Sequence, residues 1–232
     1  MPRQTYFTPA VFTFLRELAR NNNRPWFEAN KDRYINLIRE PAKEFIADFS
    51  PRLTNISDHF IADTRTNGGS LMRPYRDTRF GSDKTPYKTN VGIQFRHEMG
   101  KDAHAPGFYL HLQPEGCWAG AGLWSPDPKV AKKIRDQIFE HPDGWNKASK
   151  AQPFTNSWTI SYDDDYMLKR VPKDYGPDFV YGDDVRKKSF TATTKLTQKR
   201  VTSASFDDDL ANLFSDASPY VDFLCQAVNL PY

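Results

Sequence analysis

Hydrophobic residues recur every three to four positions along the first sixty residues of the chain. Phe12, Leu15 and Leu18 share one face at this spacing, and Thr8-Pro9 before them is typical of a helix start. Further stripes of this kind follow, and Pro51 is expected to kink or end the third helix because proline lacks a backbone N–H. This part of the sequence therefore predicts a layer of helices.

After residue 90 the period changes to two, which is the spacing of a strand with two different faces. Alternating segments cover residues 91–96, 108–113 and 117–124, and a weaker alternation from Phe190 to Leu196 predicts an edge strand. Helical spacing returns near the C-terminus. We therefore expect one α+β domain, residues 1–232, with an N-terminal helical layer, a central, mainly antiparallel sheet and C-terminal helices packed on the sheet.

One of the predicted strands, residues 117–124, has an unusual face. One side carries small and hydrophobic residues, and the other brings together Trp118, Gly120, Gly122 and Trp124. Glycine in a strand interior is unfavourable unless something approaches the backbone closely. Two tryptophans that flank two glycines therefore predict a shallow slot with aromatic ends, which could form the wall of a pocket. The alternative is a site where a helix packs tightly onto the sheet.

The densest group of charged side chains lies between the helical and the strand-like regions, from Arg73 to Asn90. Arginine binds phosphate and carboxylate through paired hydrogen bonds, and lysine adds a point charge. The stretch therefore predicts an anion-binding site that consists of Arg73, Arg76, Arg79, Lys84 and Lys88. The three arginines are spaced by three, which places them on one side of a turn or helix; in an extended chain they would alternate instead.

Two acids in the same stretch leave a second interpretation open. Asp77 and Asp83 could neutralise two of the cations, so that the stretch forms internal salt bridges and only holds a loop in place. Asp77 and Tyr87 are also candidates for proton transfer, although no catalytic residue can be assigned. The predicted helix start at Ser125-Pro126 would add free N–H donors for an anion.

The total charge favours a small anionic ligand over nucleic acid. Thirty-two Lys and Arg residues against 29 Asp and Glu residues give a net charge of only +3, whereas general nucleic-acid binders carry a dominant positive field. The alternative is a module that binds nucleic acid or an acidic protein. It would use the basic stretch together with a second basic segment, which contains Lys169, Arg170, Lys173, Arg186, Lys187 and Lys188.

Other chemistry has little support in the sequence. The histidines and cysteines lack the spacing of metal ligands, so we expect no metal and no cofactor. His97 and His111 could face each other on neighbouring strands; a histidine satisfied within the sheet is the alternative. No apolar run reaches the length of a membrane span and no signal peptide opens the chain, so a cytoplasmic protein is expected. Its oligomeric state stays open.

Residues 76–90, Arg-Asp-Thr-Arg-Phe-Gly-Ser-Asp-Lys-Thr-Pro-Tyr-Lys-Thr-Asn, closely resemble the signature of the domain of unknown function 2461 family of conserved hypothetical proteins. Residues 7–27, 107–110, 120–124, 168–173 and 187–190 look like further parts of the same family, so the resemblance covers nearly the whole chain. It implies a bacterial and partly fungal family without an assigned activity. No catalytic residue is therefore transferred to this chain.

Overall fold

The computed structural model describes residues 4–79, 82–100 and 105–232, and it has the expected α+β architecture. Its centre is a six-stranded antiparallel sheet with the strand order β1-β2-β3-β4-β6-β5. The strands are β1 (Phe60–Ile61), β2 (Val91–His97), β3 (Gly107–Leu112), β4 (Cys117–Leu123), β5 (Thr159–Ile160) and β6 (Phe190–Leu196). Three of the strands predicted from alternation thus lie side by side in the middle of the sheet.

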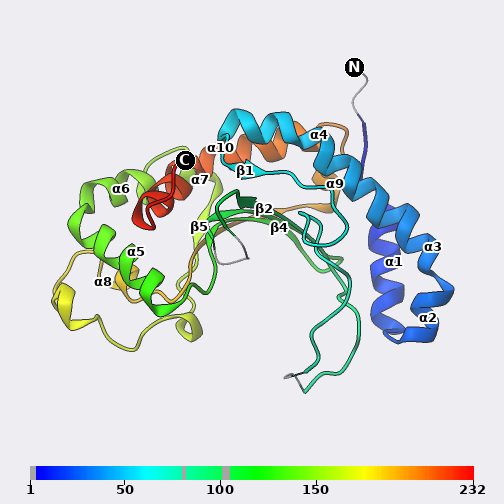
Figure 1. Cartoon of the computed structure of the whole chain (residues 1–232), viewed down its shortest axis with the longest axis horizontal. Coiled ribbons are helices and arrows are strands. Elements are labelled where there is room, and N and C mark those ends of the chain that lie inside the picture. The colour runs from blue at the N-terminus through cyan, green and yellow to red at the C-terminus, as the bar shows by residue number, and fades with distance from the viewer. Residues whose placement is uncertain (1–3, 80–81, 101–104) are drawn as a thin grey trace.

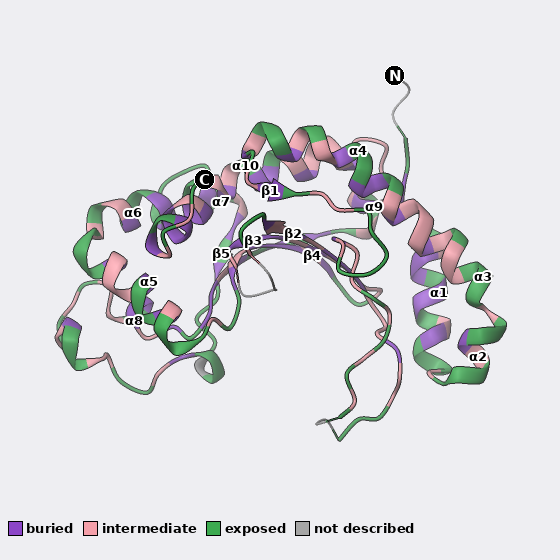
Figure 2. Cartoon of the chain, viewed as in Figure 1, coloured by how far each residue is buried: buried purple, intermediate pink, exposed green. Residues whose placement is uncertain are grey.

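Two long helices, α4 (Glu40–Ile56) and α10 (Phe206–Ala227), cover one face of this sheet. The ring of Phe49 in α4 lies 5.1 Å from that of Phe95, and Phe214 in α10 stacks on Phe108 at 4.6 Å. Figure 2 shows the buried residues of both helices gathered along the side that meets the strands. The apolar positions of the strands therefore face these helices, and burial of their side chains stabilises the sheet.

The N-terminal helices pack at one end of the sheet (Figure 1). They are α1 (Pro9–Arg20), α2 (Arg24–Ala29) and α3 (Lys31–Tyr34), and a π-helical turn, Ile35–Arg39, leads from α3 into α4. Pro51 lies inside α4, so the part of the prediction in which it ends the helix is wrong. Pro51 is exposed, whereas the neighbouring Phe49 and Leu53 are buried. Packing of these side chains outweighs the loss of one backbone hydrogen bond.

At the other end of the sheet lie several shorter elements (Figure 1). They are α5 (Pro128–Glu140), α6 (Pro142–Lys150), α7 (Phe154–Ser157) and α8 (Gly182–Val185), while α9 (Gln198–Val201) connects β6 to α10. The prediction that residues 190–196 form an edge strand is wrong, because β6 lies between β4 and the short β5. This pairing joins distant parts of the chain, and no local pattern reveals it. None of the described helices has the length and apolar character needed to cross a membrane.

Candidate functional site

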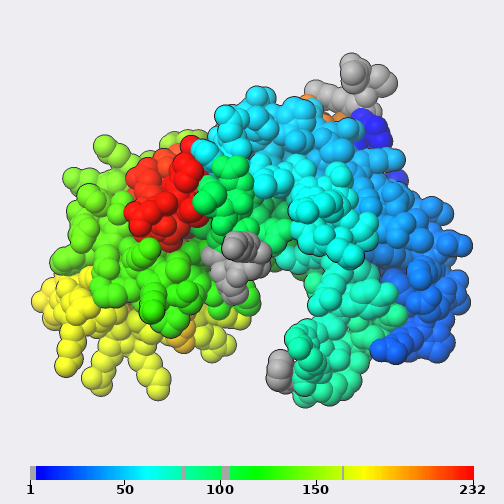
Figure 3. All heavy atoms as spheres, in the orientation of Figure 1, coloured from blue at the N-terminus to red at the C-terminus, as the bar shows by residue number. Residues whose placement is uncertain are grey.

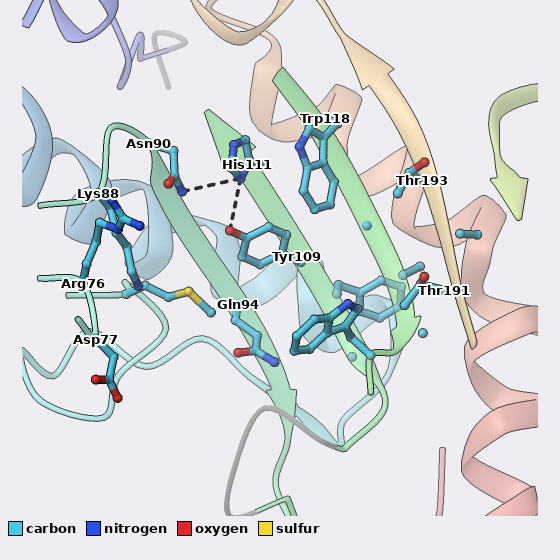
Figure 4. A pocket seen from close by; sticks show the side chains of 18 residues that line it. Arg76, Asp77, Lys88, Asn90, Gln94, Tyr109, His111, Trp118, Thr191 and Thr193 are labelled. Carbon is cyan, nitrogen blue, oxygen red and sulfur yellow. Dashed lines mark hydrogen bonds between the residues drawn. The ribbon is translucent and has the colours of Figure 1, made fainter. Parts of the chain in front are cut away.

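The face of the sheet that α4 and α10 leave uncovered forms the floor of an open cavity of about 580 Å³. Figure 3 shows the molecule hollowed below the sheet. Because side chains alternate along a strand, the polar positions of the strands point into this cavity. The floor includes Gln94, Tyr109, His111, Trp118, Gly120, Gly122, Thr191 and Thr193 (Figure 4). Trp124, which is 55% exposed, follows the end of β4 and lines the same cavity.

The basic stretch projects from the sheet as a hairpin, which we call the basic hairpin (residues 73–88, of which 80 and 81 are not described). Tyr75 pairs with Tyr87 across it, the Arg76 N–H donates to the Pro86 carbonyl at 2.9 Å, and the Lys88 N–H donates to the Pro74 carbonyl at 2.7 Å. Of the two arrangements left open for Arg73, Arg76 and Arg79, the pairing at the base of the hairpin therefore favours the extended one over a shared side of a turn or helix. In an extended pair the period is two, so residues three apart point to opposite sides.

Of the five cations predicted to bind an anion, Arg76 and Lys88 line the cavity. The side chains of Arg73, Arg79 and Lys84 are exposed and lie outside its lining. Arg79 forms an ion pair with Asp77 at 2.7 Å, and the Lys84 Nζ donates to the Thr78 carbonyl at 2.7 Å. The hairpin thus contributes two cations to the cavity. Arg79 and Lys84 instead make contacts within the hairpin itself.

The two cations that line the cavity differ in their surroundings. One N–H group of Arg76, at Nη1, contacts both the Asp83 carboxylate and the Thr85 hydroxyl. These contacts hold the pKa of Asp83 at about 2, chiefly through the Arg76 hydrogen bond, so this acid is ionised at neutral pH.

Lys88 is half-buried, and its ammonium group has no hydrogen-bond or ion-pair partner among the residues that the structure describes. Burial, and secondarily the nearby Arg73 guanidinium, lower its pKa. A partly buried charge without a counter-charge is unfavourable, and an anion from outside would relieve it. Lys88 is therefore the cation in the cavity with the greatest capacity to receive a ligand.

The two candidates for proton transfer lie in different places. Asp77 lines the cavity, but hydrogen bonds from the Arg79 side chain hold its pKa at about 2. It is therefore ionised at neutral pH and poorly matched to proton exchange there. Tyr87 is buried and lines a second, smaller cavity of about 330 Å³ together with Arg76 and Lys88. Its ring packs against Phe27, and burial raises the pKa of its hydroxyl.

An aromatic platform covers the centre of the cavity floor. The Trp118 indole stacks on the His111 ring, with 4.9 Å between centroids and 14° between planes, and the Tyr109 ring lies 5.1 Å away. A Cβ atom at Gly120 would lie only 3.0 Å from Cζ3 of Trp118. The missing side chain at Gly120 therefore leaves room for the indole.

The glycine at position 122 is explained by its backbone conformation and its close contacts. Its φ of +116° is one that other residues rarely adopt, and a Cβ there would lie 2.2 Å from the Phe190 carbonyl oxygen and 3.1 Å from the ring of Tyr220 in α10. Tight packing, partly against a helix, thus explains Gly122. The interpretation that a helix packs closely on the sheet therefore applies to Gly122, while a slot at Gly120 stays a prediction.

His111 is held from both sides of its ring. Its Nε2 lies 2.9 Å from Oε1 of Gln113, while Nδ1 lies 3.3 Å from the Tyr109 hydroxyl and 3.5 Å from the Asn90 side-chain nitrogen. An amide oxygen only accepts and an amide nitrogen only donates, so these contacts assign the proton to Nε2. Burial lowers the pKa of the ring and favours this neutral form. The expected meeting of His97 and His111 is wrong, since their strand partners are Phe60 and Gly92.

The helix start that was expected to add anion donors is already occupied. Helix α5 begins at Pro128 with Asp127 as its cap, and the Asp127 side chain accepts hydrogen bonds from the N–H groups of Lys129 and Val130 at 2.8 and 2.9 Å. The prediction that this helix starts at Ser125-Pro126 is therefore wrong by two residues. A carboxylate of the chain itself takes the place that a bound anion would need.

Several cavity residues were not identified from the sequence. These are Met72, Asn90, Gln94, Tyr109, His111, Thr191 and Thr193. Most of them are the polar members of the alternating strands, so a signal existed. The sequence does not distinguish a polar strand position that faces open solvent from one that faces a cavity.

Comparison with known proteins identifies the family and adds no activity. A family model described as a conserved hypothetical protein, DUF2461, matches residues 10–223. No curated protein and no solved structure matches the chain. The match spans most of the 232 residues and confirms the resemblance of the basic hairpin and its flanking segments. The chain therefore belongs to the DUF2461 family.

Proposed function

We propose that this protein binds a small molecule with a phosphate or carboxylate group in the cavity on the open face of the sheet. Lys88 is the main anion-binding group, and Arg76 assists it. The observation that carries the proposal is the half-buried Lys88 ammonium, which has no counter-charge among the described residues. Whether binding leads to a reaction is a separate question, because no group with a suitable proton-transfer chemistry is assigned.

Arg76 supports this arrangement without being fully available. Its Nη1 group is held by Asp83 and Thr85, whereas its Nε and Nη2 groups have no hydrogen-bond partner within the described part of the chain. The internal contacts fix the direction of the guanidinium group. A guanidinium that is held in this way loses less conformational entropy when it binds an oxyanion.

Calorimetric titration tests the proposal with inorganic phosphate, citrate and adenosine 5′-monophosphate as probes at low ionic strength. The Lys88→Met variant should weaken binding of the best probe by about 10- to 100-fold, because a hydrogen bond to a charged group contributes about 1.5–3 kcal/mol. Lys84→Met is the matched control, since Lys84 is on the same hairpin but outside the cavity. Equal affinities for wild type and Lys88→Met, or no binding of any probe, would contradict the proposal.

A second candidate function is a module that binds nucleic acid or an acidic protein. It is favoured by one observation: the basic hairpin and the second basic segment flank the same hollow of the molecule from opposite sides (Figure 3). Lys169, Arg170, Lys173 and Arg186 line an open depression of about 650 Å³ on that second side. Lys187 is only 1% exposed and does not belong to this surface.

Salt dependence separates the two candidates. A surface that neutralises several phosphates loses affinity steeply as salt rises, by orders of magnitude between about 50 and 200 mM salt for six or more contacts. Binding of a dT15 oligonucleotide, followed by fluorescence anisotropy, should show this slope if the second candidate is correct. The loss of oligonucleotide affinity with rising salt should be less steep in the Lys169→Ala/Arg170→Ala double variant. Lys88→Met alone should change this salt dependence little.

A further inference from the structure

We infer that the ligand of the open cavity is an elongated molecule with a planar heterocyclic ring at one end and an anionic group at the other. The ring would stack on Trp118, and the anionic group would reach Lys88. This inference rests on the proposed function and specifies its substrate class. The size of the cavity, the aromatic platform and the free polar groups of the floor support it independently.

The size of the cavity is the first of these observations. Its volume of about 580 Å³ falls within the range of about 300–1,000 Å³ that is typical of sites for drug-sized organic ligands. A phosphate or a small carboxylate alone would fill only a minor part of it. Most of the floor would then stay in contact with water, although aromatic rings form its centre. The cavity therefore fits a larger molecule that also buries apolar area.

The aromatic platform is held in place by contacts within the protein. Trp118 is supported by the His111 ring at 4.9 Å and by the Tyr109 ring at 5.1 Å, and His111 is itself held by Gln113. The indole also packs over Gly120, where a Cβ would lie 3.0 Å from its Cζ3. A ring that is fixed in this way loses little conformational freedom when a second ring stacks on it, so the full stacking energy contributes to binding.

The register of the sheet places polar groups on either side of this platform. Gln94 lies opposite Tyr109, Tyr109 opposite Gly120, and Gly120 opposite Thr193. These positions form one row across four strands, with a side-chain-free position next to Thr193. Adjacent strands are about 4.8 Å apart, so Gln94 and Thr193 are separated by roughly 14 Å. The row is longer than a single ring, which agrees with an elongated ligand.

The polar side chains of this floor are available to form hydrogen bonds with the edge of a ligand ring. The side chains of Gln94, Thr191 and Thr193 have no hydrogen-bond partner within the described residues, and all three line the cavity. Each can donate and accept a hydrogen bond. A pure hydrocarbon ring would displace their water without replacing its hydrogen bonds, which is unfavourable. A heterocycle with ring nitrogens or exocyclic polar groups would satisfy them.

The charges are confined to the opposite side of the cavity. Figure 4 shows Arg76 and Lys88 on one side of the floor, Tyr109 and Trp118 in the middle, and Thr191 and Thr193 on the far side. Asp77 lies on the same side as the two cations, but it is paired with Arg79 at 2.7 Å. The order from the charged side through the aromatic rings to the neutral polar groups therefore gives the ligand a direction. Its anionic group lies near the basic hairpin and its ring lies over β3 and β4.

Two pairs of probes test the inference, each with the same anionic group in the presence and absence of a ring. Adenosine 5′-monophosphate is compared with ribose 5-phosphate, and nicotinate is compared with acetate, by calorimetry at low ionic strength. We expect the ring to increase affinity at least tenfold in one of the pairs, and the pair identifies phosphate or carboxylate as the preferred anion.

Variants then locate the ring. Trp118→Leu should abolish the difference within the preferred pair and leave the affinity of the ringless compound within twofold, whereas Trp124→Leu should preserve the difference. Gln94→Met, which keeps the side-chain length, should weaken the ring compound about fivefold or more and the ringless one within twofold. This variant removes no core contact and therefore tests the inference even if Trp118→Leu fails to fold.

The outcomes distinguish this inference from the proposed function on which it rests. If ringless and ring-bearing compounds bind equally and Lys88→Met weakens both, anion binding stands and the inference about the ring is overturned. A ring effect that is lost in Trp124→Leu and kept in Trp118→Leu also overturns it. If none of the four probes binds wild-type protein, the proposed function and this inference both fail.

Discussion

The aromatic rings of Phe27 and Tyr87 stack face to face, with centroids 4.0 Å apart and 15° between their planes. Next to this contact, the Asn22 side chain donates to the Tyr87 carbonyl at 2.9 Å and accepts from the Tyr87 N–H at 3.0 Å. The N-terminal helices therefore hold the base of the basic hairpin. Because Lys88 follows Tyr87, the position of the cation in the cavity depends on packing sixty residues earlier in the chain.

Shortening Tyr87 to alanine should destabilise the protein strongly. Tyr87 is 2% exposed, and removal of a large buried aromatic side chain typically costs about 3–5 kcal/mol. Tyr87→Phe should change the free energy of unfolding by less than about 1 kcal/mol, because it keeps the ring on which the contact with Phe27 depends. Urea denaturation of both variants measures the difference. A large loss in Tyr87→Phe would instead assign an essential role to the hydroxyl.

Replacement of Asn22 by alanine should affect both stability and ligand binding. It leaves the N–H and carbonyl groups of buried Tyr87 without their partners, which costs about 1–3 kcal/mol for each unsatisfied buried group. The hairpin base should loosen, so binding of anionic probes at Lys88 should weaken severalfold in calorimetry. Asn21→Ala is the matched control, because the Asn21 side chain donates to the nearby Glu17 carbonyl at an exposed site and has no other hydrogen bond to a described residue. Equal effects of the two substitutions would contradict this role of Asn22.

Much of the fold could be predicted because it depends on local patterns. The alternation in residues 91–96 and 108–113 identified β2 and β3 and the side of each that faces the core. The arrangement of the arginines could not be predicted in this way. Their spacing by three is meaningful only for a helix or turn, whereas the pairing of Tyr75 with Tyr87 makes the hairpin extended. Such pairing joins separate segments, and spacing alone does not reveal it.

The candidate site was predictable only in part, for a related reason. Trp118 and Gly120 stood out because glycine and tryptophan are unusual at neighbouring positions on one strand face. Tyr109 and Gln94 are ordinary polar-face residues, and their role depends on strands and a hairpin that come together from residues 73 to 193. Lys88 was named among five similar cations. Only the three-dimensional contacts distinguish it from Arg79 and Lys84, which have partners on the hairpin itself.

Alanine at Gly122 should destabilise the sheet, whereas alanine at Gly116 should not. Gly122→Ala forces a left-handed φ of +116° on a residue with a Cβ and places that atom 2.2 Å from the Phe190 carbonyl oxygen. We expect a loss of at least about 2 kcal/mol in the free energy of unfolding. At Gly116 no atom lies within 4 Å of an added Cβ, so alanine there should change stability by less than about 1 kcal/mol. Thermal unfolding followed by circular dichroism compares the two variants. Similar melting temperatures would contradict the prediction that a Cβ at position 122 strains the backbone.

The buried Lys187 predicts a specific dependence of stability on pH. Burial lowers its pKa to about 8, its Nζ donates to the Ser161 carbonyl, and it lies 3.7 Å above the Tyr162 ring. Between this value and the usual lysine pKa of about 10.4, the unfolded chain binds more protons than the folded chain. The contribution of Lys187 to the free energy of unfolding therefore rises with pH in this window, by roughly 2 kcal/mol between pH 8 and pH 10.

Comparison of wild type with Lys187→Met measures this contribution, because the titration of the tyrosines is common to both proteins. The difference in the free energy of unfolding, wild type minus variant, should increase from pH 8 to pH 10 in urea denaturation. Lys188→Met provides the control, since the side chain of Lys188 is exposed. Its difference from wild type should be independent of pH in the same range. A flat difference for Lys187→Met would show that Lys187 is not desolvated in solution.

The sheet that is covered on only one side has a consequence for how this protein can diverge. In β3, Leu110 and Leu112 pack in the core, while the intervening Tyr109 and His111 face the cavity. Substitutions at every second position can therefore alter ligand specificity without removing core contacts. We expect the scaffold to tolerate wide variation in the residues of its open face other than Gly122. The same separation makes it a convenient starting point for engineering new binding specificities.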